Sequence, residues 1–315
     1  MLLSTPTRLL WLNAGDASPA ALIDDVRVEA LAANDETTVA CLAGGEIAAV
    51  ASDGAVAAGY YADIDLAVES ALILAADPLE LLLGTAEARI FRFAPDRAIS
   101  PLDGFDQLDC RPSWYTPWGG PPAVRCLARS GGHSHGDHDW IYADVHVGSI
   151  MRSPDHGTTW EPVTPDLHED VHQVATTPAR PAAVYANTAD AVYVSADHGT
   201  TWTHRATNLP QRYGRALAVH PHHPDILLAS TSRGPHQQVD ARLHRSIDAG
   251  LTWTQVAGRF PPSSQNNIDT FHLTFDSHGT AWCAVDDALY VSRDSGENWA
   301  VACELDEPIE LIACS

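Results

Sequence analysis

Short runs of β-branched, aromatic and apolar residues recur along the whole chain and are separated by Gly, Pro and Asp. One set of such runs covers residues 171–175, 184–186 and 193–195, and further sets precede and follow it. Residues of the first kind favour strands, whereas Gly, Pro and Asp favour turns. The pattern therefore predicts an all-β protein.

An eight-residue motif of the frame S-x-D-x-G-x-x-W follows four of these sets. Its copies begin at Ser153, Ser195, Ser246 and Ser292, so the steps are 42, 51 and 46 residues. Within a copy, the Asp can accept backbone N–H bonds, the Gly supplies a positive φ and the Trp starts the next strand. We therefore interpret the motif as a hairpin turn. Its period indicates a propeller or solenoid array.

The same spacing of strand-like runs extends over the N-terminal third, where residues 52–54 form only a degenerate copy of the motif. The chain ends with one strand-like run and begins with two more, so the two ends would share a blade and close the ring. Seven blades of about 45 residues account for the length. We predict one seven-bladed β-propeller domain over residues 1–315, with blades near 25–60, 66–105, 123–165, 171–207, 214–257, 268–301, and 308–315 plus 1–22.

The motif resembles the Asp-box (BNR) repeat of sialidases, of sortilin-type receptors and of the photosystem II assembly factor. The resemblance implies that each box lies at the turn between the third and fourth strands, on the face opposite the active site. We therefore expect the boxes to be structural.

All 18 basic residues are Arg, against 41 acidic residues, and the net charge is −23. This balance argues against non-specific binding to nucleic acid or to an anionic membrane. No basic leader with an apolar core opens the chain, and no apolar run reaches the roughly 18 residues of a membrane-spanning helix. Six scattered cysteines favour reduced thiols. We expect a cytoplasmic monomer.

Aligning the innermost strands places one ionisable residue of each blade in register at the mouth of the central channel. Blade one leaves Arg27 and Glu29 open, and the others give Glu69, Arg125, His172, Arg215, Asp269 and Glu310. Charged side chains are rarely buried unpaired, so this ring suggests a site. The alternative is a water-filled channel with mutually neutralising pairs.

Loops on the same face add aromatic and polar residues of the kinds that line ligand pockets. The candidates are Trp114, Tyr115, Trp118, His146, Tyr213, Arg233 and Asn267.

Two chemistries fit this ring. In the first, Arg125 and Arg215 bind a carboxylate or phosphate, and His172, Asp269 or Glu310 acts as acid or base. This is similar to sialidases, but no Arg-Ile-Pro motif is found, and a third arginine is available only if Arg27 or Arg233 serves. Sialidase activity itself is therefore not predicted.

In the second chemistry, a divalent metal is the cofactor. His146 and His172 would bind it together with Glu69, Asp269 or Glu310. The neighbouring arginines count against a cation there.

The segment His133–His138 matches H-x-H-x-D-H, the zinc motif of metallo-β-lactamase-like hydrolases. Here it falls in a loop on the box face, away from the predicted mouth, so we interpret it at most as an adventitious metal-binding loop.

Two classes of function stay open. The ring favours a hydrolase- or lyase-like enzyme that acts on a small anionic or glycosidic ligand. The alternative is a non-enzymatic propeller that uses the same face to bind a protein partner.

Overall fold

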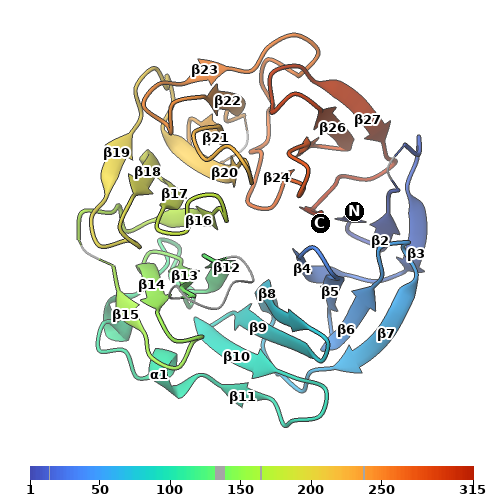
Figure 1. Cartoon of the computed structure of the whole chain (residues 1–315), viewed down its shortest axis with the longest axis vertical. Coiled ribbons are helices and arrows are strands. Elements are labelled where there is room, and N and C mark those ends of the chain that lie inside the picture. The colour runs from blue at the N-terminus through green and yellow to red at the C-terminus, as the bar shows by residue number, and fades with distance from the viewer. Residues whose placement is uncertain (14, 132–138, 164, 237) are drawn as a thin grey trace.

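Seven four-stranded antiparallel sheets are arranged in a ring (Figure 1). The computed structural model describes residues 1–13, 15–131, 139–163, 165–236 and 238–315. The predicted all-β, seven-bladed propeller is confirmed.

From the innermost strand outwards, the sheets are as follows. Blade one holds β4 (Val28–Ala33), β5 (Thr38–Leu42), β6 (Glu46–Val50) and β7 (Val56–Tyr61); blade two holds β8 (Val68–Ala76), β9 (Leu79–Thr85), β10 (Arg89–Phe93) and β11 (Ser100–Pro101); blade three holds β12 (Val124–Arg129), β13 (Ile141–Val145), β14 (Ser149–Ser153) and β15 (Glu161–Pro162); blade four holds β16 (Val171–Thr176), β17 (Val184–Thr188), β18 (Ala191–Ser195) and β19 (Thr203–Arg205); blade five holds β20 (Tyr213–Val219), β21 (Leu227–Ser232), β22 (Arg242–Ser246) and β23 (Thr254–Gln255); blade six holds β24 (Leu273–Phe275), β25 (Ala281–Val285), β26 (Ala288–Ser292) and β27 (Ala300–Glu304); blade seven holds β28 (Leu311–Ala313), β1 (Leu2–Ser4), β2 (Arg8–Trp11) and β3 (Ala20–Asp24). Two short helices, α1 (Asp103–Asp106) and the 3-10 helix η1 (Arg111–Ser113), lie between blades two and three.

The seventh blade is built from both ends of the chain. β28 pairs antiparallel with β1, with Leu3 opposite Ile312, and both termini lie near the centre of the ring (Figure 1). This closure leaves no free innermost edge. The predicted split blade is confirmed.

One predicted strand is wrong. The predicted register puts Asp269 on the inner strand of blade six, at residues 268–271, but that strand is β24, further along the chain. Polar side chains capture the backbone before it: Asp269 Oδ1 accepts the Thr270 N–H at 2.8 Å, and His272 Nδ1 accepts the Asp269 N–H at 3.2 Å. Such local bonds compete with sheet pairing, and Phe271 follows at φ 65°. The segment is therefore a turn.

Each Asp-box is a hydrogen-bonded turn between the third and fourth strands of its blade. In the second copy, Asp197 Oδ1 accepts the Thr201 N–H and the Ser195 hydroxyl, both at 2.8 Å, and Oδ2 accepts the Thr201 hydroxyl at 2.7 Å. His198 and Gly199 both have positive φ, 57° and 81°. Trp202 Nε1 donates to the Gly199 carbonyl at 3.1 Å and so covers the turn.

Arginines on the third strands connect the boxes of neighbouring blades. Arg152 donates to the carbonyl of His198 at 2.6 Å, and Arg245 donates to that of Ser295 at 2.8 Å. Arg92 donates in the same way to His156. The accepting residue is each time the one before the box glycine. Because its φ is positive, its carbonyl is available to the neighbouring blade.

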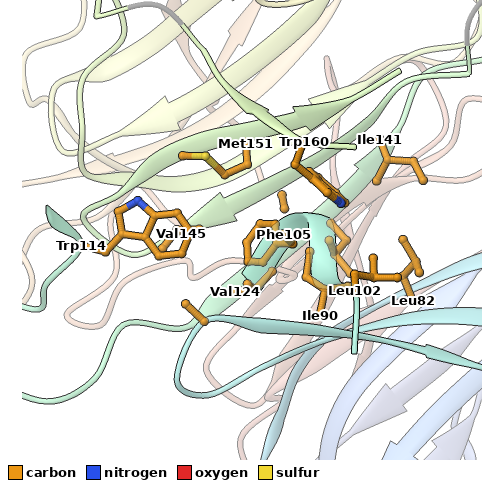
Figure 2. Packing of buried hydrophobic residues seen from close by; sticks show 13 residues of the cluster. Leu82, Ile90, Leu102, Phe105, Trp114, Val124, Ile141, Val145, Met151 and Trp160 are labelled. Carbon is orange, nitrogen blue, oxygen red and sulfur yellow. The ribbon is translucent and has the colours of Figure 1, made fainter. Parts of the chain in front are cut away.

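Apolar side chains fill the space between neighbouring blades. Figure 2 shows the cluster between blades two and three, in which Phe105 of α1 lies between Trp114 and Trp160. The ring centroids are 5.6 Å apart for Phe105 and Trp114, and 5.2 Å apart for Phe105 and Trp160. Trp160 belongs to a box, so this cluster connects the box face with the opposite face.

Replacing Asp197 with Asn should lower the free energy of unfolding by about 1–3 kcal/mol, because the amide cannot accept all three bonds. Urea unfolding measures this loss. Asp53→Asn is the matched control, since in the degenerate box the carboxylate accepts the Ala55 N–H at 3.0 Å and no second hydrogen bond among the described residues. Equal losses in both variants would contradict the structural role of the box.

Candidate functional site

A β-bulge in five of the inner strands positions the site. The pairing of the inner strand with its neighbour skips between Val28 and Ala30, Val68 and Ser70, Val124 and Cys126, Val171 and Gln173, and Gly214 and Leu217. The unpaired residues are therefore Glu29, Glu69, Arg125, His172, and Arg215 with Ala216. A bulge re-aims a side chain without ending the strand. In blade one the bulged residue is Glu29, so Glu29 and not Arg27 occupies the predicted ring position.

Three titratable side chains meet at the mouth on blades three and four, and we call them the Asp170 cluster. Asp170 Oδ1 lies 3.3 Å from His172 Nε2 and 3.5 Å from His146 Nε2. His146 comes from the turn between β13 and β14, and Asp170 comes directly before β16. The Asp170 carboxylate is thus held between two imidazoles.

Aromatic rings and arginines surround this cluster. The Trp118 ring lies 4.7 Å from His146, and the Tyr213 ring lies 4.8 Å from His172. Arg125 donates to the Val171 carbonyl at 2.8 Å. Its Nε is buried without a hydrogen-bond partner among the described residues. The predicted residues Arg125, His146, His172 and Tyr213 are therefore brought together.

A cavity of about 530 Å³ lies beside the cluster and is lined by Arg215, Asn267, Asp269 and Glu310, together with Thr270 and His272. Arg215 lies 3.2 Å from Asp269 Oδ2, and its guanidinium carbon lies 5.6 Å from the Tyr213 ring centroid. Arg215 therefore connects this cavity to the Asp170 cluster. The predicted ring forms two adjacent subsites rather than a single pocket.

Two predicted binding residues lie elsewhere. Trp114 is only 8% exposed, because Phe105 and the Arg111 guanidinium cover its ring, so it belongs to the core. Arg233 is exposed, is paired with Asp240 at 3.1 Å and is not among the residues that line the cavity. Tyr115 and Trp118, by contrast, are 49% and 70% exposed. The Tyr115 hydroxyl donates to Glu169 at 3.3 Å.

His172 is completely buried and its Nδ1 faces the Gly214 carbonyl. A ligand at the mouth therefore meets Asp170 before it meets His172. The catalytic role predicted for His172 stays a prediction. Because His172 is buried, such a role requires it to act on the ligand through Asp170.

The environments of two mouth carboxylates shift their pKa values in opposite directions. Burial acts to raise the pKa of Asp170, but the bond to His172 and the charges of His146 and Arg125 outweigh it, and the pKa is lowered. Burial and then the charge of Glu29 raise the pKa of Glu69, against Arg125 and Arg27. Arg125 acts on both carboxylates and so lies within electrostatic reach of each.

The turn at residues 268–272 forms the floor of the mouth. The Thr270 hydroxyl donates to the His172 carbonyl across the channel at 2.9 Å, and the Ile312 N–H donates to the Phe271 carbonyl at 3.0 Å. Thr270 lines the upper cavity, whereas Phe271 lines a second cavity of about 910 Å³ towards the box face. The channel is thus divided in two.

No three His, Cys, Asp or Glu side chains within the described residues are arranged to hold a metal ion. The predicted metal at His146 and His172 gains no support from this geometry, and Arg125 beside them disfavours a cation. The motif His133–His138 lies outside the described residues. Among the helices of the described chain, none has the length and apolar character needed to span a membrane.

The sortilin/Vps10 family model matches residues 148–260. Over the whole ring, a GH74 xyloglucanase from Xanthomonas campestris superposes with a TM-score of 0.72 at 17% identity, covering 98% of this chain and 51% of that one. The structure described as YCF48 bound to D1 peptide superposes with a TM-score of 0.59 at 14% identity, covering 89% and 84%. At such identities these structures share the fold alone. The chain is an Asp-box β-propeller.

Curated relatives of this Asp-box propeller include two xyloglucanases. The oligoxyloglucan-reducing end-specific xyloglucanase of Emericella nidulans is 36% identical over 120 residues, 35% of this chain and 14% of that protein. Xyloglucanase Xgh74A of Acetivibrio thermocellus is 27% identical over 205 residues, 51% of this chain and 24% of that protein. The matches therefore span a quarter or less of these relatives.

The sequence reasoning missed two acidic residues of the propeller. Asp170 precedes His172 by two residues, and this spacing was the available signal. Asp144, in β13, is fully buried, and neither of its oxygens has a hydrogen-bond partner among the described residues. Burial raises its pKa to about 7, against the charge of Arg125.

The equivalent positions in the next two blades carry side chains that donate hydrogen bonds. Asn187 occupies the equivalent position in β17, and its amide donates to the Ala216 carbonyl at 2.8 Å and to the Ser230 carbonyl at 3.1 Å. Ser230 occupies it in β21 and donates to the Ile268 carbonyl at 2.7 Å. In these two blades the position faces carbonyl acceptors of the next blade, and by the same repeat a protonated carboxyl group suits Asp144 better than an ionised one.

Asp144 should therefore make stability depend on pH. Between about pH 4 and pH 7 the folded state keeps a proton that the unfolded state releases, so the free energy of unfolding falls as pH rises, by on the order of a few kcal/mol. Asp144→Asn should lose this dependence and become the more stable form above pH 7. Urea unfolding between pH 4 and pH 8 measures both curves.

Asn187→Asp is the matched control, because it should introduce the same dependence into blade four. Parallel curves for the native protein and Asp144→Asn would contradict the assignment.

Proposed function

We propose that this propeller binds an oligosaccharide at the mouth and hydrolyses a glycosidic bond there. Asp170 is the general base that takes a proton from the attacking water. Glu69 is the general acid that protonates the leaving glycosidic oxygen as the bond from the anomeric carbon breaks. The proposal is carried by two carboxylates that both lie within electrostatic reach of Arg125 and whose pKa values shift in opposite directions, since an acid and a base must differ in this way.

The aromatic residues at the mouth support a saccharide ligand. Trp118 and Tyr115 present exposed rings beside the Asp170 cluster, and such flat apolar faces bind sugar rings. The curated relatives are xyloglucanases, which adds to the case for a glycan. We keep the proposal to the class of ligand, because those relatives are much longer than the matched segments.

The finer part of the proposal is an anionic group on the saccharide. Arg125 forms no ion pair among the described residues, and the Nε atoms of both Arg125 and Arg215 are buried without hydrogen-bond partners there. Guanidinium groups bind carboxylates strongly. We therefore favour a uronic acid, with its carboxylate on the side of blades three to five.

Release of new reducing ends from xyloglucan and from uronate-containing oligosaccharides tests the activity. Asp170→Asn and Glu69→Gln should each lower kcat at least about 100-fold. The pH profile should be bell-shaped, since Asp170 must be ionised and Glu69 protonated. Asp170→Asn should remove the acidic limb and Glu69→Gln the alkaline limb.

Glu36→Gln is the control for this activity, because Glu36 lines the other half of the channel and should not affect turnover. Full activity in both mouth variants would contradict the assigned roles.

Calorimetry with matched acidic and neutral oligosaccharides tests the anionic group. Arg125→Gln should weaken binding of the acidic ligand by about 1.5–3 kcal/mol and leave the neutral ligand unaffected. Arg212→Gln, on the exposed rim, is the control. Tighter binding of the neutral ligand would overturn the anionic part. Preferential binding of a peptide with a free carboxyl terminus would favour the interaction propeller instead.

A further inference from the structure

His172 has a buried imidazole whose two nitrogens each face an oxygen. Nδ1 faces the Gly214 carbonyl, and Nε2 lies 3.3 Å from Asp170 Oδ1. A carbonyl can only accept, so Nδ1 carries a hydrogen and donates it. The tautomer of His172 is therefore fixed by the backbone of blade five.

This tautomer leaves two acceptors facing each other unless a second proton lies between them. Nε2 of His172 and Oδ1 of Asp170 are both buried; among the described residues Nε2 has no other polar partner, and Oδ1 has only the contact with His146 Nε2 at 3.5 Å. A bare lone pair opposite a carboxylate is unfavourable in a buried setting. A proton between Nε2 and Oδ1 makes a charge-assisted bond. Burial lowers the pKa of His172 overall, and the bond to Asp170 acts against that shift and favours the protonated ring.

The position of the imidazole is fixed from three sides. The Thr270 hydroxyl donates to the His172 carbonyl, and Tyr213 packs against the ring. Gly214, whose carbonyl anchors Nδ1, is itself packed against Asn187, because a Cβ there would lie 1.7 Å from Asn187 Oδ1. The ring therefore cannot move away from Asp170 without disturbing two blades.

We propose that His172 is a positioning residue: anchored by the Gly214 carbonyl, it holds the Asp170 carboxylate in the orientation in which that carboxylate accepts a proton at the mouth. His172 does not touch the ligand, since it is completely buried. The inference rests on the role proposed above for Asp170.

Other charged groups also face Asp170 and contribute to any pH effect measured there. They are His146 after β13, Arg125 on β12, Arg215 on β20 and the buried Asp144 on β13, with Tyr213 and Tyr115 as neutral phenols. Of the two histidines beside Asp170, His172 is the one whose second nitrogen faces a backbone carbonyl, that of Gly214. Variants at this one position therefore separate its contribution from theirs.

Two substitutions at position 172 separate the contact of the imidazole with Asp170 from its contact with Gly214. In His172→Gln, the longer amide can place its N–H₂ near the former Nε2 and so keep a donor to Asp170. In His172→Asn, the shorter amide can reach only towards Gly214, as Nδ1 does. The Asp170 carboxyl pKa, followed by carbon NMR in each folded variant, reports the difference without requiring any activity.

The expected result is a rise of the Asp170 pKa by at least about one unit in His172→Asn, a tenfold gain in proton affinity, and a value close to the native one in His172→Gln. The acidic limb of kcat/KM should shift in the same way. An unchanged Asp170 pKa in His172→Asn would overturn the proposal. So would equal rises in both variants with native melting temperatures, which would indicate a packing role only.

If the NMR shifts appear but no saccharide is cleaved, the proposed function fails and the positioning of Asp170 stands.

Discussion

The extra residue in each bulged inner strand is the constraint on which the site depends. It directs an ionisable side chain towards the mouth while the next residue turns back towards the neighbouring blade. Ser70 donates to the Val124 carbonyl at 2.8 Å, the Cys126 thiol to that of Val174 at 3.3 Å, and Gln173 accepts the Leu217 N–H at 2.9 Å. The strand segment that presents the charges thus also joins the blades. In a regular strand these two residues would point to opposite faces of the sheet. The strand would then neither present the charged side chain at the mouth nor place the next residue against the neighbouring blade.

The two faces of the propeller have different roles. On one face, the boxes and the arginines of the third strands connect blade to blade through turns whose geometry leaves little freedom. On the other, the turns before β12 and β16 and after β13 carry Trp118, Asp170 and His146 to the mouth, and Tyr213 reaches it from the start of β20. The turn with Thr270 and Phe271 separates these two regions inside the channel. Changes at the mouth therefore need not disturb the elements that stabilise the ring.

The sequence pattern was sufficient for the fold because the box recurs at blade spacing and each turn is made by local hydrogen bonds. It also placed Arg125, His172 and Arg215 correctly, since the run of valine or glycine, an ionisable residue and a small or polar one repeats in successive inner strands. It failed at residues 268–271, where Asp269 and His272 bond to the nearby backbone and outweigh strand propensity. It failed for Trp114 because burial of that ring depends on Phe105 from an inserted helix. The contact of Asp170 with His146 of the preceding blade and the burial of Asp144 depend on the assembled ring, and neither is visible in a run of residues.

The most direct measurement is a crystal structure of the protein soaked with a uronate-containing oligosaccharide. The account predicts a saccharide at the mouth, with its carboxylate on Arg125 and Arg215, a sugar ring on Trp118, and the glycosidic bond between Asp170 and Glu69. A saccharide bound instead in the cavity behind Phe271 or along the boxes, with the mouth free of it, would contradict the account.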